Sequence, residues 1–273
     1  MSQRLEGKVA IVTGGASGFG KGIATKFIQE GGKVIVADLS AEAGEAVASE
    51  LGSSATFQKA DVTKREDWEQ LLKTATDSFG GLDVVVNNAG TTYPNKPTEQ
   101  VTDKEFDVCF TVNVRSIYLS TNVLLPYFLE KGRPGSFISI ASTAGVRPRP
   151  GLAWYNASKA AVINATKSMA VEYGPKQIRF NSVSPVFGSG TGLFIFVGQV
   201  VIALWPEAKD GGFRLDFDAS FVTLAVAAMA PSTIGFARHH AIKNEKEDAE
   251  KLINLDVLCD LAEMVKVLKR IGA

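Results

Sequence analysis

Near its amino terminus the chain reads Val9-Ala-Ile-Val-Thr-Gly14-Gly-Ala-Ser-Gly18-Phe-Gly20. The first four residues are apolar and mostly β-branched, which predicts a buried strand. The glycines that follow have the spacing Gly-x-x-x-Gly-x-Gly, which suits a tight turn leading into a helix. Backbone N–H groups at a helix start are unpaired and carry partial positive charge. A strand, a glycine-rich turn and a helix in this order can therefore hold a phosphate group.

Short apolar runs and longer amphipathic segments alternate from this stretch to about residue 185. This alternation, with strands that are apolar almost throughout, predicts an α/β fold: a Rossmann-like, doubly wound parallel sheet covered by helices on both faces, in a single main domain. Ligands then gather at the carboxyl ends of the strands. The predicted strands are residues 9–12, 34–37, 56–59, 84–87, 136–141 and 179–183, and the predicted helices are residues 18–30, 41–51, 64–79, 103–131 and 154–173.

Composition limits the classes of partner. The chain has 273 residues, of which 45% are hydrophobic, and 29 lysines and arginines balance 29 aspartates and glutamates. A zero formal charge without a basic stripe disfavours nucleic acid as a partner. The amino terminus lacks an apolar leader, and Cys109 and Cys259 lack metal-ligand spacing, so a reducing, cytoplasmic setting is expected.

Two further features are expected to have no membrane or metal role. Residues 193–205 and 219–230 are apolar, but both runs are shorter than the roughly 18 residues that indicate a membrane-spanning helix. No membrane association is therefore expected. His239-His240 has no other ligand residues nearby at metal-binding spacing, so we expect no metal site.

A carboxylate at the end of the second predicted strand bears on the ligand of the glycine turn. Asp38 lies about 20 residues after the turn, where it can accept hydrogen bonds from an adenosine ribose and would repel a 2′-phosphate. Neither Ser17 nor Leu39 supplies the cation that such a phosphate needs. NAD is therefore favoured over NADP. The glycines taken alone are equally consistent with an ordinary turn.

A second constellation lies in the middle of the chain. Tyr155 and Lys159 are four residues apart, which places a phenol and an ammonium on one helical face, and Ser142 ends an apolar run thirteen residues earlier. A cation beside a phenol stabilises the phenolate, so we expect Lys159 to lower the pKa of Tyr155 and make it a general base. Taken alone, such a pair is more often an inward-packed ring and a solvated ammonium on an amphipathic helix.

The glycine turn, Asn87-Asn-Ala-Gly90, Ser142 and Tyr155-x-x-x-Lys159 occur here in that order, and with them the chain resembles the short-chain dehydrogenase/reductase family over residues 5 to about 192. The resemblance implies that Tyr155, Lys159 and Ser142 act together with Asn113 of Thr111-Val-Asn-Val. It also implies that Lys159 binds the nicotinamide ribose and that Asn113 holds a water between Lys159 and solvent. The expected NAD contacts are Gly14, Ser17, Gly18, Phe19, Gly20, Asp38, Asp61, Val62, Asn88, Ala89, Gly90, Tyr155, Lys159, Pro185 and Thr191.

Some of these positions are also explained by local structure. Asp61-Val62 and Asn88-Ala89-Gly90 follow predicted strands, where small and polar residues are common turn formers. Asparagine is unfavourable in the middle of a helix, so a local reason is expected for Asn113. Pro126 is expected to bend the same helix.

The resemblance ends before the chain does. Residues 1–192 are interpreted as the NAD-binding and catalytic Rossmann domain, and residues 193–273 as an atypical carboxy-terminal segment that covers the substrate, contributes oligomer contacts, or does both. Asp210-Gly-Gly212 comes earlier than in the family, and residues 246–271 have helical spacing.

The sequence supports three functions. The first is an NAD-dependent oxidoreductase, a short-chain alcohol dehydrogenase or ketone reductase, that interconverts a secondary alcohol and a ketone with a tyrosine general acid/base. The second is an NAD-binding sensor or scaffold with poor catalysis because of the altered tail, and the third is a dehydratase or epimerase. The full set of four residues favours the first over the third. By resemblance the protein forms a homodimer or homotetramer and binds a small alcohol or ketone.

Overall fold

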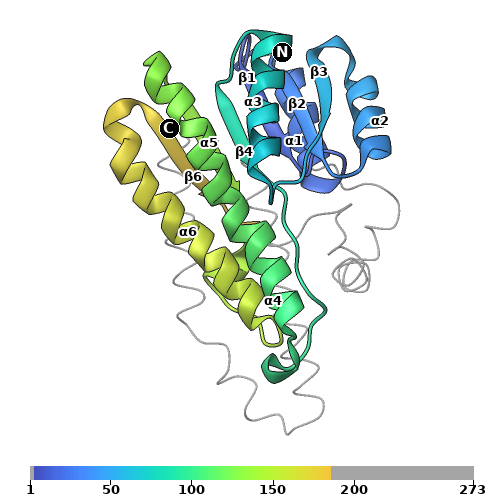
Figure 1. Cartoon of the computed structure of the whole chain (residues 1–273), viewed down its shortest axis with the longest axis vertical. Helices are drawn as coiled ribbons and strands as arrows, with labels where there is room; N and C mark the ends of the chain where they lie inside the picture. The colour runs from blue at the N-terminus through green and yellow to red at the C-terminus, as the bar shows by residue number, and fades with distance from the viewer. Residues whose placement is uncertain (1–2, 186–273) are drawn as a thin grey trace, which may run out of the picture. The chain divides into compact units, whose positions relative to one another are not determined.

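The structure is a computed structural model that describes residues 3–185. Thr191, the carboxy-terminal segment 193–273 and the two histidines lie outside the described residues. The described chain forms a six-stranded sheet in the order β3-β2-β1-β4-β5-β6, and every neighbouring pair is parallel (Figure 1). This confirms the predicted Rossmann-like α/β fold. The strands are β1 (Val9–Thr13), β2 (Lys33–Asp38), β3 (Ala55–Lys59), β4 (Val84–Asn87), β5 (Gly135–Ile140) and β6 (Ile178–Val183).

Helices connect the strands in the alternation that the sequence predicts. The α-helices are α1 (Gly18–Gln29), α2 (Ala41–Leu51), α3 (Arg65–Phe79), α4 (Asp103–Phe110), α5 (Ser116–Lys131) and α6 (Ala153–Tyr173). Shorter turns of helix are η1 (Gly52–Ser54), η2 (Thr98–Gln100), η3 (Thr111–Arg115), η4 (Thr143–Gly145) and η5 (Gly174–Lys176). Each predicted helix lies within two residues of an observed one at both ends, except that the fourth is divided into α4, η3 and α5.

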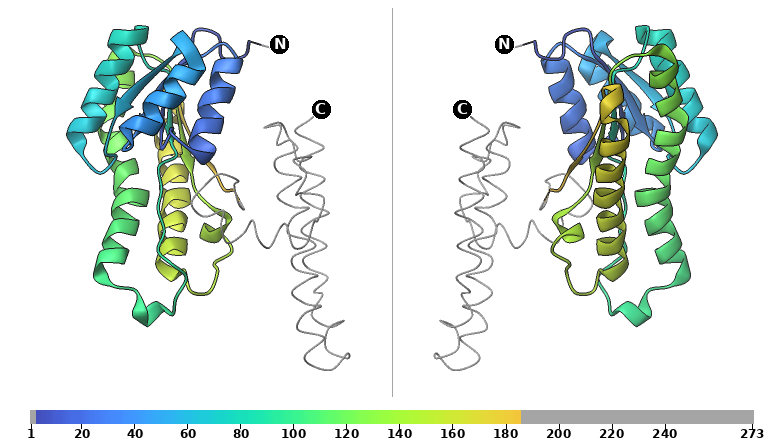
Figure 2. Two further views of the ribbon diagram at one scale, coloured as in Figure 1. Left: turned by 90° about the vertical axis from the view of Figure 1, so that its right-hand side faces the viewer. Right: turned by 90° about the vertical axis from the view of Figure 1, so that its left-hand side faces the viewer.

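Helices cover both faces of the sheet, and alternate strand residues supply the two cores (Figure 2). In β1, Ile11 packs with side chains of α3 and α5, whereas Val12 packs with those of α1 and α2. Both residues are fully buried. Because neighbouring residues of a strand point to opposite faces, a strand buried on both sides must be apolar at every position. This explains the continuous apolar run in the sequence.

The long helical segment between β4 and β5 is interrupted by a π-turn. Helix α4 passes through η3, a π-helical turn, into α5, and α5 continues through Pro126. Residues 103–131 are long and apolar enough to cross a membrane by length and composition. They pack instead against the core, where Leu119, Leu124 and Phe128 join the cluster formed with α3 and the sheet. A buried core helix passes the same test.

The strand order reverses between β1 and β4, and this reversal places the candidate site. The connections from these two strands lead to opposite faces of the sheet, and in doubly wound sheets ligands bind beyond the carboxyl ends of strands at such a reversal. Thr13, the last residue of β1, bridges the two strands: its hydroxyl donates to the Val86 carbonyl at 3.3 Å and accepts from the N–H groups of Asn88 and Ala89, each at 3.0 Å. The two strand ends are thereby held in one geometry.

Candidate active site

The glycine turn packs closely against the neighbouring strand end. Gly14 has φ +62°, a conformation that favours glycine. A Cβ on Gly20 would lie 2.0 Å from the Gly14 carbonyl oxygen and 2.7 Å from Asn88 Nδ2, so no side chain fits there. The glycine at position 20 therefore lets the first turn of α1 approach β1 and β4. Ser17 is the N-cap of α1 with extended backbone and makes no capping hydrogen bond, and Phe19 lies in the first turn.

Asp38 connects the glycine turn to the end of β2. One carboxylate oxygen accepts from the Ala16 N–H at 3.1 Å, and the other accepts from the Ser40 N–H at 3.1 Å. Each carboxylate oxygen can accept a second hydrogen bond, so the group can also receive ribose hydroxyls. The turn, the start of α1 and this carboxylate fit an adenosine diphosphate moiety that carries free ribose hydroxyls.

The segment after β4 forms the opposite wall. The Asn88 side-chain amide donates to the carbonyl of Thr13 at 2.8 Å and to that of Gly14 at 3.2 Å. Gly90 lies beside the catalytic candidates, because a Cβ placed there would be 3.2 Å from Lys159 Nζ and 3.3 Å from Asn113 Oδ1. The Asn88-Ala89-Gly90 segment therefore connects the glycine turn directly to the predicted catalytic residues.

Asp61 and Val62 have clear structural partners. Asp61 accepts hydrogen bonds from the backbone N–H and the hydroxyl of Thr63 at 2.9 and 2.7 Å, and its own N–H donates to Asp67. Burial acts to raise the pKa of Asp61, but the Thr63 hydrogen bonds and the nearby Lys64 ammonium outweigh it, so this pKa is lowered. Val62 packs against the core, and its carbonyl accepts from the Trp68 indole at 2.9 Å. This geometry supports the turn interpretation, and the cofactor role stays a prediction.

Ser142, Tyr155 and Lys159 come together on one side of the strand ends. Tyr155 is hydrogen-bonded to the Ser142 side chain. The Lys159 ammonium lies 5.9 Å from the centroid of the Tyr155 ring and donates to the Ile140 carbonyl at 2.9 Å. Pro185 lies at the same edge, since its carbonyl accepts from the Thr143 N–H at 3.1 Å. The phenol, the hydroxyl and the ammonium predicted from sequence are therefore neighbours in the structure.

Burial controls the proton affinities of this group. It lowers the pKa of Lys159 from its ordinary value of 10.5 to about 8, because an ammonium is poorly solvated there. It also raises the pKa of Tyr155, although the Ser142 hydrogen bond and the charge of Arg149 act in the opposite direction. The expectation that Lys159 lowers the pKa of Tyr155 below its usual range is therefore wrong for the protein alone. Sequence spacing indicates the neighbouring charge, but the desolvation depends on how much protein surrounds the ring.

Asn113 lies in η3 and is 2% exposed. Its Oδ1 accepts from the Thr91 N–H at 2.8 Å, and its Nδ2 donates to the Thr91 carbonyl at 2.9 Å. A π-turn adds a residue to the helix and is often found at functional sites. The widened turn and the paired hydrogen bonds are the local reason expected for an asparagine here. Its water-holding role stays a prediction.

Several residues in this cluster are not among the predicted ones. Thr13 bridges β1 and β4, Arg149 acts electrostatically on Tyr155, and Cys109 and Ser158 contact the Asn113 amide. Ser158 stands directly before Lys159, at the same helical face as Tyr155, which is the one sequence signal that could have identified it. Thr13 has no local signal, because its partners come from a segment more than seventy residues away.

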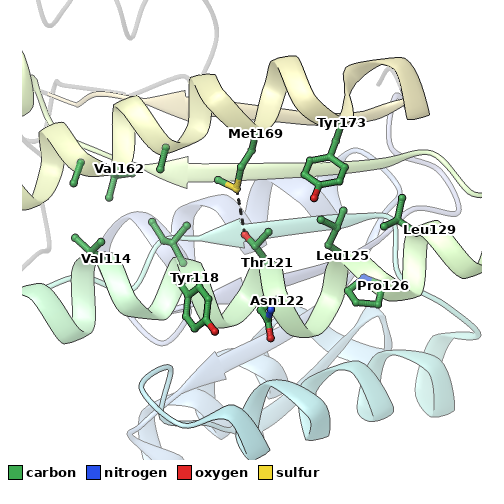
Figure 3. Close-up of a pocket in the computed structure, with 13 residues that line it drawn as sticks. Val114, Tyr118, Thr121, Asn122, Leu125, Pro126, Leu129, Val162, Met169 and Tyr173 are labelled. Carbon is green, nitrogen blue, oxygen red and sulfur yellow. Dashed lines mark hydrogen bonds between the residues drawn. The ribbon is translucent and has the colours of Figure 1, made fainter.

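A cavity of about 450 Å³ is lined by residues of η3, α5 and α6 (Figure 3), and Ser142, Tyr155 and Lys159 are not among them. Its walls are mostly apolar and include Tyr118, Leu125, Met169 and Tyr173. Tyr118 is 58% exposed. This surface is therefore separate from the cluster of Ser142, Tyr155 and Lys159.

Comparisons with known proteins match mainly the amino-terminal two thirds of the chain. A family model described as short chain dehydrogenase matches residues 8–195. The 4-formylbenzenesulfonate dehydrogenase of Comamonas testosteroni is 47% identical over 198 residues, which cover 71% of this chain and 78% of that protein. The 3-alpha-(or 20-beta)-hydroxysteroid dehydrogenase of Mycobacterium tuberculosis is 41% identical over 186 residues, covering 68% of this chain and 70% of that protein.

A solved structure agrees with the fold. The 3-ketoacyl-(acyl-carrier-protein) reductase from Brucella melitensis, complexed with NADH, superposes with a TM-score of 0.65 at 42% identity. The match covers 66% of this chain and 76% of that one. With the parallel sheet, the glycine turn and the Ser142, Tyr155 and Lys159 cluster in place, the chain belongs to the short-chain dehydrogenase family.

Proposed function

We propose that the protein is an NAD-dependent oxidoreductase that interconverts a secondary alcohol and a ketone. The carrying observation is the convergence of Ser142, Tyr155 and Lys159 beside Gly90, at the strand ends where the glycine turn lies. When bound, NAD would supply the acceptor for the hydride that leaves the alcohol carbon.

Tyr155 is the proposed general acid/base. In oxidation its phenolate takes the hydroxyl proton of the alcohol, and in reduction its phenol returns a proton to the carbonyl oxygen. Ser142, already hydrogen-bonded to Tyr155, is proposed to donate to the same substrate oxygen as negative charge develops there. Lys159 contributes positive charge beside the ring and is proposed to bind the nicotinamide ribose.

NAD rather than NADP is the proposed cofactor. Asp38 is fixed by two backbone N–H groups at the end of β2, so its negative charge stays beside the glycine turn. A 2′-phosphate at this place would meet like charge. Leu39, the next residue, is 63% exposed and apolar, and it offers no cation.

Substrates that carry an anionic substituent are the first class of substrate to test. The positive charge of Arg149 reaches the Tyr155 hydroxyl, and Arg147 lies two residues before it in the same loop. The relative that is 47% identical is a dehydrogenase of formylbenzenesulfonate, which carries a sulfonate on an aromatic ring. A carboxylate- or sulfonate-bearing aromatic alcohol or carbonyl compound therefore belongs in every substrate panel.

The test combines binding and turnover on the full chain. NADH binding is measured by fluorescence, and turnover is measured over a panel of neutral and anionic secondary alcohols, ketones and aromatic aldehydes. We expect tight NADH binding and turnover that Tyr155→Phe abolishes. Tight binding with no turnover across the panel would instead support the second candidate, an NAD-binding sensor or scaffold. That candidate is favoured by the extent of the short chain dehydrogenase match, which ends at residue 195.

The proposed assembly is a homodimer or homotetramer. Members of the family commonly form oligomers, and the apolar surface of α5 and α6 is the proposed contact between copies (Figure 3). Tyr118 and Leu129 are exposed on it, and its lining lacks charged side chains. Size-exclusion chromatography with light scattering on Tyr118→Glu tests this, and a mass equal to that of the unaltered protein would contradict it. The proposed compartment is the cytoplasm, and residues 193–273 are proposed to contribute to the substrate cover or to this assembly.

A further inference from the structure

We infer that Ser158 is a positioning residue that, together with the Thr91 backbone, sets the orientation of the Asn113 amide, whose Oδ1 and the Lys159 ammonium both lie close to Gly90. The inference rests on the proposed function for its kinetic consequences but not for its geometry. Ser158 is fully buried in α6, and its hydroxyl lies between the backbone of its own helix and the π-turn η3. The four predicted catalytic residues do not include it.

The direction of the hydrogen bonds follows from counting protons. A serine hydroxyl has one proton, and that of Ser158 goes to the Tyr155 carbonyl at 2.7 Å. Toward Asn113 the hydroxyl can then only accept. The atom that faces it at 3.0 Å must be a donor, which is Nδ2. The Ser158 hydroxyl therefore selects the amide end of Asn113 that points into α6.

The backbone of Thr91 selects the same orientation. Its N–H donates to Asn113 Oδ1 and its carbonyl accepts from Nδ2. A flipped amide would oppose donor to donor and acceptor to acceptor at Thr91, and would also face Ser158 with an acceptor that receives no proton. The reversed orientation loses three hydrogen bonds in a buried place, where each unpaired group is destabilising.

The selected orientation matters for Lys159. Asn113 Oδ1 and Lys159 Nζ border the same small space at Gly90, since a Cβ there would lie 3.3 Å from one and 3.2 Å from the other. An acceptor oxygen on this side favours the charged form of the lysine, whereas an NH₂ group would oppose it. Ser158 thus acts on Lys159 through Asn113, without touching the reacting atoms.

Other charged or titratable groups near Lys159 also affect the pH profile. Within residues 3–185, the titratable groups that interact with Lys159 or Tyr155 are Cys109 from α4 and Arg149 from the loop before α6. Cys109 is buried, which raises the pKa of its thiol, and its sulfur lies 3.4 Å from Asn113 Nδ2. This sulfur already accepts from Nδ2, and the Thr91 backbone holds both ends of the amide, so removing the Ser158 hydroxyl should weaken the control and not abolish it.

The test compares Ser158→Ala with a matched control, Ser120→Ala. Ser120 is equally buried and bonds back to its own helix, donating to the Ile117 carbonyl at 3.0 Å, but it does not contact Asn113. Both variants are measured by selective ¹⁵N labelling of asparagine, with the Asn113 side-chain resonance identified by its loss in Asn113→Ala. We expect this resonance to move in Ser158→Ala and to stay in place in Ser120→Ala.

The kinetic measurement uses the best alcohol of the substrate panel. Ser158→Ala should lower kcat for oxidation about fivefold, which corresponds to a loss of roughly 1 kcal/mol of transition-state stabilisation. It should also move the pH profile to higher pH, because a less charged Lys159 stabilises the phenolate less. In an Asn113→Ala background, Ser158→Ala should change neither quantity further. Ser120→Ala should leave both unchanged.

Three results would overturn the inference: an unmoved Asn113 resonance in Ser158→Ala, an unchanged pH profile, or effects that add fully in the Asn113→Ala background. If Ser158→Ala does not fold, Ser158→Cys carries the test, with shifts in the same direction and smaller because sulfur is a weak acceptor. If the unaltered protein turns over nothing on the panel, the proposed function fails, while the resonance still decides the positioning role.

Discussion

Replacement of Lys159 by methionine should make the stability of the protein respond differently to pH. The Lys159 side chain is buried, with the residue 5% exposed, and this burial lowers its pKa from 10.5 to about 8. Between these two values the unfolded chain holds a proton that the folded protein does not. Stability therefore rises with pH across this window, because the buried charge that opposes folding is removed.

The magnitude follows from the two pKa values. From pH 7 to pH 9.5 this one group should stabilise the folded state by roughly 2 kcal/mol, and the contribution continues to grow until the unfolded value is passed. The thioether that Lys159→Met introduces has no such titration. The difference in free energy of unfolding, variant minus unaltered protein, should thus fall by roughly 2 kcal/mol over the same interval. The variant also loses the hydrogen bond to the Ile140 carbonyl. This loss changes the free energy of unfolding by the same amount at every pH in the interval.

Urea unfolding at pH 7, 8, 9 and 9.5, at one protein concentration, measures the difference. Cys109 and Tyr155, whose pKa values burial raises, are present in both proteins, so their titration acts in the same direction in both. A difference that stays constant with pH would show that Lys159 keeps an ordinary pKa. The burial argument for the whole cluster would then be refuted.

Three further predictions concern the ligand and the proton. The rate of alcohol oxidation should rise with pH through one ionisation, since the phenolate is the base. Tyr155→Phe should lower kcat at least about a hundredfold and remove this ionisation. If the variant keeps the pH dependence, Tyr155 is not the general base. Asp38→Asn combined with Leu39→Arg should move the NADP/NAD preference by about tenfold, the value of one charge-assisted contact, and an unmoved ratio of binding constants would contradict the cofactor assignment. Gly20→Ala should destabilise the fold by about 1–3 kcal/mol or more, because its Cβ has no space, and should weaken NADH binding; unchanged melting and binding would show that the first turn of α1 can move away.

The sequence predicted the fold well because the determining signals are local. Helix α2 begins and ends at the predicted residues, since Ser40 accepts a hydrogen bond from the Ala43 N–H at one end and Gly52 takes φ +77° at the other. The inner strands β1, β2 and β4 are apolar at nearly every position because both of their faces are buried. Capping residues, glycines and apolar runs can each be recognised from neighbouring residues in the sequence, without knowledge of distant contacts.

The features that the sequence did not predict depend on distant partners. No change in the spacing of apolar residues marks the π-turn at Thr111–Arg115. The one local signal is an asparagine at a position where helices disfavour it. The raised pKa of Tyr155 depends on how much protein surrounds the ring. The bridging role of Thr13 depends on β4, which lies some seventy residues away in the chain. Spacing along the chain carries no record of such contacts.

Arg149 has two effects that one experiment can separate. Its charge lowers the pKa of Tyr155 against the effect of burial, and the same charge would attract an anionic substituent on the substrate. Arg149→Gln should move the pH profile of alcohol oxidation upward for every substrate, because the first effect does not depend on the substrate. Only for a carboxylate- or sulfonate-bearing substrate should KM also rise, and Arg149→Lys should restore most of both. A profile that moves without a selective rise in KM would leave Arg149 as a charge that tunes the base, and the preference for anionic substrates would be contradicted.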